Sequence, residues 1–197
     1  WLEDPKGIFE QLTSYCLSKY KWEDLEVLYP YLIDLKYTDL IMKVSQQLAH
    51  VARSYILQFN DVLQEVLCDE DRNIWNAIRC EIFYWIGDFD ECIKVSNDLL
   101  TVISLEDNLK DYVHLNLAIA YFFLGEWDLS NDNLNKVFKS SKRMEGWKNL
   151  ISGTIDAIRG VDFDKGISHL SDSIKILCDI DDIIGVGIAY GNLGECY

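Results

Sequence analysis

Cysteine, histidine and clustered acidic side chains are the groups in this sequence that could bind a metal ion or act as nucleophiles. The six cysteines form no CxxC pair and no clustered framework, which predicts reduced thiols in place of a redox pair or a disulfide scaffold. The three histidines, His50, His114 and His169, match neither HExxH nor a Cys/His ligand spacing. The spacing of these residues therefore predicts no metal site.

The acidic stretches and the glycines give no stronger indication of catalysis. CDIDDI (178–183) and CDEDRN (68–73) lack the twelve-residue spacing of an EF-hand calcium loop, so we interpret them as solvated linkers that cap helices. The sequence contains no GxxxxGK[ST], GxGxxG or GxSxG motif, which disfavours the common nucleotide and hydrolase sites. We expect a protein that is not an enzyme and that carries no cofactor.

The composition predicts a folded, acidic protein. Of the 197 residues, 49% are hydrophobic and 13% are aromatic, which excludes intrinsic disorder. The net charge of −15, from 33 acids and 18 bases, argues against binding to nucleic acid or to an anionic membrane, and a charged partner would be basic. Solubility alone is the alternative role of this charge. No apolar run approaches the ~20 residues of a membrane span, and reduced thiols without a signal-like segment predict a cytoplasmic location.

A short motif recurs along the chain at YKWEDL (20–25), GDFDEC (87–92), GEWDLS (125–130) and VDFDKG (161–166). Its aromatic residues are separated by 67, 38 and 36 positions, and the first gap leaves room for one degenerate copy near Phe59. A period of roughly 34–38 residues is typical of a helix–turn–helix repeat. The aromatic residues that mark the copies are Trp22, Phe89, Trp127 and Phe163.

The segments between these motifs have helical character and few strand signals. Asp88, Glu126 and Asp162 each precede the motif's aromatic residue, where a carboxylate can accept backbone N–H groups at a helix start. Gly87 and Gly125 fit the preceding helix end, where a positive φ is often needed. We expect eleven helices, near 6–19, 22–35, 38–56, 60–68, 71–86, 89–101, 108–124, 127–140, 144–160, 163–177 and 182–197.

The stretch NLAIAYFFLGEWDLSNDNLNKVF (116–138) resembles the tetratricopeptide repeat. The stretch 191–197 is similar to the start of another copy, and 73–100 and 147–174 are further copies in which Arg79 and Val161 replace the expected leucine and turn glycine. Residues 9–32 match more loosely, and 38–68 match only in being helical. The positions of 116–138 that fit the family are Leu117, Ala118, Tyr121, Gly125, Trp127, Ser130, Leu134 and Val137.

The resemblance implies an all-α fold, a right-handed α-solenoid of about five helical hairpins. Residues 1–70 would form degenerate hairpins, and 71–197 would hold the clearer repeats, at about 71–104, 108–141, 144–178 and, incomplete, 182–197. Cys80 and Cys92 fall on the small-residue places where the helices of one hairpin touch, which predicts packing roles for both thiols.

In this family the first helix of each hairpin lines a concave groove that binds partners. The groove implied here is apolar, which suggests an amphipathic helix or extended peptide as ligand. Asn116 and Lys148 fall on two places of the family's carboxylate clamp, but Ala77, Glu81 and Ser152 occupy the other three, so we expect no chaperone-tail clamp. Packing against the next hairpin, or against another part of a longer chain, is the alternative role for these side chains. The predicted groove residues are Tyr84, Trp85, Tyr112, Leu115, Asn116, Ile119, Phe122, Phe123, Lys148 and Ile155.

These observations favour a non-catalytic scaffold that binds a protein or peptide segment. The alternative is a regulatory or sensor domain of a larger signalling ATPase, protease or transcription regulator, whose partner is another domain of the same chain. The absence of an initial methionine and the end in mid-repeat at 197 favour a piece of something longer. An enzyme is the third hypothesis, and it rests on the acidic clusters alone.

Overall fold

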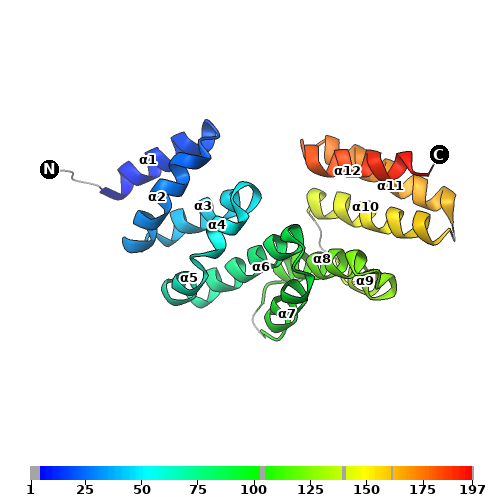
Figure 1. Cartoon of the computed structure of the whole chain (residues 1–197), viewed down its shortest axis with the longest axis horizontal. Coiled ribbons are helices and arrows are strands. Elements are labelled where there is room, and N and C mark those ends of the chain that lie inside the picture. The colour runs from blue at the N-terminus through cyan, green and yellow to red at the C-terminus, as the bar shows by residue number, and fades with distance from the viewer. Residues whose placement is uncertain (1–4, 103–104, 139–140, 161, 197) are drawn as a thin grey trace. The chain divides into compact units, whose positions relative to one another are not determined.

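Helices account for all the regular secondary structure in the computed structural model, which describes residues 5–102, 105–138, 141–160 and 162–196 (Figure 1). The expectation of an all-α fold is confirmed for these residues, in which no strand occurs. None of the helices in these ranges is long and apolar enough to cross a bilayer. The helices are α1 (Pro5–Ser18), α2 (Trp22–Asp34), α3 (Thr38–Val51), α4 (Arg53–Leu57), α5 (Asn60–Val66), α6 (Asp69–Ile86), α7 (Phe89–Leu100), α8 (Asp107–Phe123), α9 (Trp127–Leu134), α10 (Lys142–Arg159), α11 (Phe163–Cys178) and α12 (Ile183–Gly194).

The helices form two compact units. Unit 1 is Trp1–Gly87 and holds α1 to α6, and unit 2 is Asp88–Tyr197 and holds α7 to α12. The division after Gly87 follows the packing of the backbone. The boundary expected near residue 70 came from matching repeats, and it stays a prediction.

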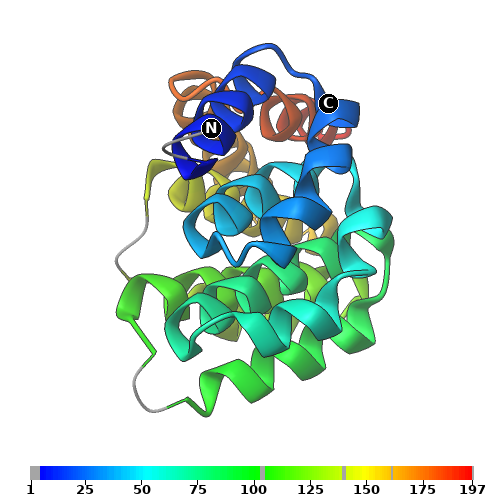
Figure 2. The same ribbon diagram turned by 90° about the vertical axis from the view of Figure 1, so that its left-hand side faces the viewer.

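Aromatic side chains connect several helices of unit 1, which run from blue through cyan to green in Figure 2. Tyr29 of α2 is fully buried, and its ring meets that of Phe59 edge-on at 5.3 Å. The Tyr29 hydroxyl bonds the buried hydroxyl of Ser45 on α3, at 2.6 Å. Tyr55 of α4 donates a hydrogen bond to the Glu26 carbonyl of α2, at 2.6 Å. Large rings with satisfied polar atoms thus join α2, α3 and α4.

Small side chains allow the helices of unit 2 to approach one another closely. A Cβ atom added at Gly153 of α10 would lie 2.9 Å from the Gly166 carbonyl oxygen of α11, so neither position has room for a side chain. Ser130 of α9 donates to the Ala118 carbonyl of α8 at 2.7 Å, and Ser173 of α11 donates to the Gly146 carbonyl of α10 at 2.8 Å. In this unit α10 contacts both α8 and α12 as well as its sequence neighbours α9 and α11.

Several predicted helix ends are confirmed. Asp88 accepts the Glu91 N–H at 3.2 Å, and Asp162 accepts the Lys165 N–H at 3.0 Å. Gly87 and Gly125 end α6 and α8 with φ of 83° and 77°, as expected where only glycine is unstrained. Glu126 was expected to cap α9, but its side chain makes no capping bond. This prediction was therefore wrong. Glutamate is a poorer helix cap than aspartate, because its side chain is one methylene longer.

Two expected helices are shorter than the periodicity indicates. The helix expected at 38–56 is interrupted at Ala52, whose φ and ψ of −133° and 48° separate α3 from α4. The helix expected at 127–140 ends at Leu134. Beyond it, the Asp111 carboxylate accepts the Phe138 N–H at 3.2 Å, and Lys148 donates to the Val137 carbonyl at 3.1 Å. Side chains of α8 and α10 thus hydrogen-bond the backbone of Val137 and Phe138, which lie beyond the end of α9.

A glycine also ends α10, although the repeat comparison gave this copy none. Gly160 has φ of 62° and occupies the left-handed position at the helix end. Val161, which we expected at that turn position, lies outside the described residues. The turn glycine is therefore one residue earlier than the alignment of 147–174 with the repeat predicts.

Candidate functional site

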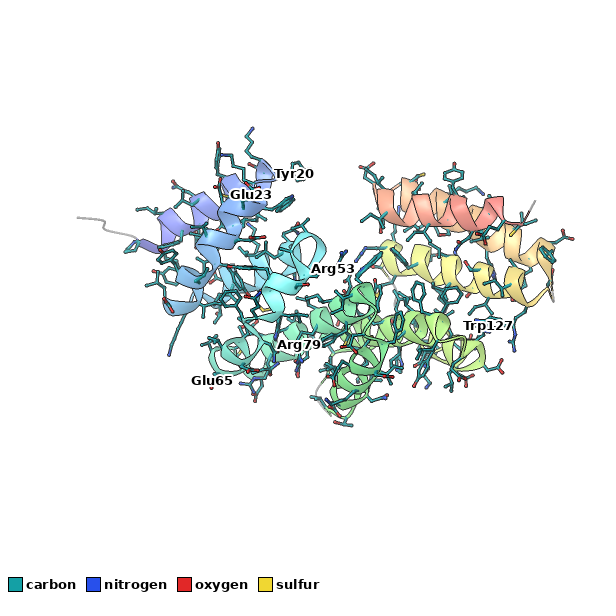
Figure 3. All side chains as sticks on the ribbon, in the orientation of Figure 1. Tyr20, Glu23, Arg53, Glu65, Arg79 and Trp127 are labelled. Atoms are coloured by element: carbon teal, nitrogen blue, oxygen red, sulfur yellow. The ribbon has the colours of Figure 1, made fainter. Side chains whose placement is uncertain are left out.

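The ten predicted groove residues come from both units. Tyr84 and Trp85, at the end of α6, belong to unit 1, and the other eight belong to unit 2. Tyr84 is buried and its ring lies 5.2 Å from that of Trp85. The Arg53 guanidinium of α4, labelled in Figure 3, lies 5.0 Å from the Trp85 ring centroid, within cation–π range.

Four of the predicted residues in unit 2 are buried. Leu115, Asn116 and Ile119 of α8 and Ile155 of α10 are between 1% and 4% exposed. The Asn116 carbonyl also lies 3.9 Å from the Cys92 thiol of α7, which is buried, as expected for a packing cysteine. These four side chains offer little surface to an incoming segment, and their place in a groove stays a prediction.

The remaining predicted residues of unit 2 differ in exposure. Tyr112 lies half-buried in the first half of α8. Lys148 is half-buried, and its ammonium group bonds the Val137 carbonyl of its own unit. Phe122 is half-buried and Phe123 is 59% exposed, at the C-terminal end of α8.

Three phenylalanines gather where α7 begins and α8 ends. The Phe89 and Phe123 rings stack with centroids 5.4 Å apart and an angle of 13° between their planes. The Phe122 ring meets Phe123 edge-on, also at 5.4 Å. We call Phe89, Phe122 and Phe123 the Phe cluster. It is a partly exposed aromatic surface in an acidic protein, and such side chains dominate the energetics of protein interfaces.

Trp127, which we expected at a helix corner, is the first residue of α9 (Figure 3). The Arg159 guanidinium of α10 lies 6.0 Å from its ring centroid and 2.8 Å from the Asp128 carboxylate. The ion pair and the ring contact therefore join the start of α9 to the end of α10, which indicates a structural role for Trp127.

Metal binding finds no support among the described residues, in which no group of three or more His, Cys, Asp or Glu side chains could hold an ion. The His114 Nδ1 atom lies 3.0 Å from Asn133 Oδ1, and the His169 Nδ1 atom lies 3.5 Å from Asp156 Oδ2. The His50 side chain lies outside the described part of the structure.

A cavity of about 200 Å³ lies between α10, the start of α11 and the end of α12, and sequence reasoning missed it. No local pattern could have identified it, because its walls join Thr154 to Asn192, which lies 38 residues further along the chain. It is lined by Thr154, Ala157, Ile158, Phe163, Asn192, Glu195 and Cys196.

The sequence matches none of the known protein families and none of the curated proteins with which it was compared. The tetratricopeptide resemblance therefore stays a hypothesis, based on the residues of 116–138 and the weaker copies around them.

Proposed function

We propose that this chain is a non-catalytic interaction module that binds a peptide or helical segment of another protein through the Phe cluster. The observation that carries the proposal is the stacked Phe89–Phe123 pair with Phe123 left 59% exposed. Stacking on the half-buried Phe89 holds the exposed Phe123 ring in place, so a partner's apolar residues can add to the cluster with little reordering.

The packing of unit 2 supports TPR-like hairpins as the scaffold for this surface. Within unit 2, helices that follow one another from α7 to α12 are in contact, and α10 also contacts α8 and α12. This succession is the one expected of stacked helical hairpins. A scaffold of this kind positions the end of α8 and the start of α7 at one surface.

The charge of the chain specifies the chemistry of the partner. A net charge of −15 attracts basic segments and repels acidic ones over about 8 Å at physiological salt. The proposed partner segment therefore carries apolar anchors for the Phe cluster and basic residues beside them. Charge of this kind raises association rates more than it raises affinity.

The test begins with the full chain, cross-linked to its partner so that the bound segment is identified and synthesised. Titration of that segment is then compared for the wild type, Phe123→Ala and Phe89→Ala. We expect each variant to weaken binding at least about tenfold, which is the effect of removing an interface hot spot. Phe138→Ala is the matched control, because Phe138 is 81% exposed and lies outside the cluster.

Equal affinity of all four proteins for the segment would overturn the proposal. If the cross-linked segment belongs to the same polypeptide in a longer form of the protein, the regulatory alternative replaces an external partner. Circular dichroism of each variant shows whether a loss of binding reflects a loss of folding.

A further inference from the structure

The cavity of unit 2 has an apolar side and a polar rim. Ala157 and Ile158 of α10 and Phe163 of α11 form the apolar side. Asn192 of α12 and Glu195, which follows that helix, supply the amide and the carboxylate of the rim. A volume of about 200 Å³ is below the roughly 300–1,000 Å³ of sites for drug-sized ligands. The cavity therefore has the size for one long side chain.

The rim has acceptors left over for a ligand. Asn192 Nδ2 donates to Thr154 Oγ1 at 2.8 Å, and the Thr154 hydroxyl donates to the Leu150 carbonyl at 2.7 Å. Among the described residues, none donates a hydrogen bond to Asn192 Oδ1 and no lysine or arginine pairs with Glu195. An amide oxygen and a carboxylate are thus available at one edge of an apolar cavity.

The cations closest to this cavity along the chain are bound elsewhere. Arg159, next to Ile158, pairs with Asp128 at 2.8 Å. Lys165, two residues after Phe163, pairs with Asp156 at 3.1 Å. Glu195 also follows the C-terminal end of α12, where the helix dipole favours a positive charge. Within the described ranges, the Glu195 carboxylate has no paired cation, and both this carboxylate and the helix end favour a positive charge at the rim.

We propose that this cavity binds the side chain of a lysine in the partner segment, an inference that rests on the proposed function. The four-carbon stem would lie against Ala157, Ile158 and Phe163, as lysine stems do on apolar surfaces. The ammonium group would donate to Asn192 Oδ1 and the Glu195 carboxylate, which matches its three donors. Arginine fits less well, because its planar, five-donor fork is bulkier than an ammonium group and the rim offers only one amide oxygen and one carboxylate.

The first test uses a probe in place of the partner. Nα-acetyl-lysine N-methylamide is titrated into the full chain, and the backbone amides are followed by NMR. We expect saturable shifts at Thr154, Asn192 and Glu195, with a dissociation constant of roughly 1–10 mM. The norleucine analogue, which has the stem without the ammonium group, and the Nε-acetylated probe are expected to bind at least about fivefold more weakly.

Two variants then distinguish the effect of the rim carboxylate from the effect of the chain's overall negative charge. Glu195→Gln is expected to weaken the lysine probe about three- to tenfold, since it keeps an acceptor but loses the charge. Glu145→Gln removes one exposed carboxylate from the start of α10 and is expected to leave the affinity unchanged. Equal binding of the lysine and norleucine probes, or no saturable shift at the cavity, would overturn the inference.

The two proposals fail separately. If the lysine probe fails while Phe123→Ala weakens the partner segment, the lysine inference is wrong and the interaction surface stands. If the probe binds selectively while Phe123→Ala leaves the partner unaffected, the Phe cluster proposal is wrong. Each lysine of the partner segment is also replaced by norleucine in turn. The inference is supported only if one of these replacements weakens binding to the wild type but not to Glu195→Gln.

Discussion

The two units reach close packing by opposite means. Unit 1 packs mainly aliphatic side chains, among which the rings of Tyr29, Phe59 and Tyr55 form a continuous edge-to-face series. Unit 2 brings backbones together through Gly153 and Gly166 on α10 and α11. Aromatic packing tolerates many sequences, whereas backbone contact demands small residues at fixed positions. The repeat motif is therefore clearer in the sequence of unit 2, where close backbone contact restricts which residues fit.

The turns between helices differ in the same way. In unit 1 the turns after α1 and α2 place Tyr20 and Lys36 in the left-handed region, with φ of 53° and 55°, and Gly87 occupies such a position only at the end of the unit. In unit 2 Gly125 and Gly160 occupy such positions, although Asp181 does so as well. A non-glycine residue there is strained by about 1 kcal/mol or more. The turns after α1 and α2 are therefore similar in conformation but lack the glycine that would mark them.

The largest effect is expected for Gly153→Ala, which tests the close contact of α10 and α11. The added Cβ would lie 2.9 Å from the Gly166 carbonyl oxygen and 2.9 Å from Leu170 Cγ, and backbone cannot move aside cheaply. We expect a loss of about 3 kcal/mol in the free energy of unfolding, measured by urea denaturation. Gly191→Ala on α12 is the control, because a Cβ there meets nothing within 4 Å. Equal stability of the two variants would remove the basis of the comparison.

Asp182 tests whether unit 2 also depends on polar contacts between helices. Burial raises the pKa of its carboxyl, but bonds from the Gly185 N–H and the Trp147 indole, with the charge of Arg143, lower the pKa below its usual value. Stability from this group is therefore full above the unfolded pKa of about 3.9 and is lost as pH falls through the lower folded pKa.

We expect Asp182→Asn to lower the free energy of unfolding by about 2 kcal/mol at pH 7 and by less below pH 3.9. Urea denaturation at several pH values measures the difference. The exposed Asp179→Asn serves as control and is expected to change stability by less than about 0.5 kcal/mol. A difference between Asp182→Asn and wild type that does not vary with pH would contradict the proposed charge pairing.

Gly125→Ala tests the turn glycines of unit 2. No atom lies within 4 Å of an added Cβ, so the whole effect comes from the backbone at φ of 77°. We expect a loss of about 1–1.5 kcal/mol in thermal or urea unfolding. Gly187→Ala adds the same methyl group to open space in α12, where φ is not positive, and is expected to gain up to about 1 kcal/mol. Opposite signs for the two variants are the prediction.

Tyr29→Phe tests the aromatic core of unit 1. Burial raises the pKa of the Tyr29 phenol, and the bond to Ser45 opposes the rise only in part. Because the folded pKa is raised, the stability from this group is present below the unfolded pKa of about 10 and is lost as pH rises above it. The variant is expected to lose about 1 kcal/mol at pH 7 and to be less sensitive to alkali than the wild type. Hydrogen exchange at pH 7 would place the loss in α2 and α3.

Lys36→Gly is expected to have the smallest effect, a gain of about 0.5 kcal/mol from relief of the strained turn. Lys43→Gly, in the exposed face of α3, is the control and is expected to lose about 1 kcal/mol. A loss of stability in both variants would show that the turns of unit 1 carry no strain.

Periodicity predicted most helices to within two residues, because local propensity and capping determine where they begin. It failed at Ala52 and after Leu134, where the chain contains no proline or glycine to signal an end. At the second site Asp111 and Lys148 bond the backbone from α8 and α10, and such distant contacts leave no local trace.

The candidate site was predictable only in part, for a related reason. Phe122 and Phe123 were identified from their place before a turn, but their pairing with Phe89 depends on how α7 meets α8. The cavity at Thr154 and Asn192 is formed by side chains 38 residues apart along the chain, so only the packed structure places them together.

Helix α12 is fastened near both of its ends. Asp182 receives bonds from Arg143 and Trp147 at one end, and Asn192 donates to Thr154 at the other. Bonds near both ends restrain α12 from rolling or sliding against α10, which favours cavity walls that keep their separation when the cavity is empty. Such preorganisation reduces the freedom that the protein loses on binding. Loosening Asp182 is therefore expected to weaken a ligand at the opposite end of the helix.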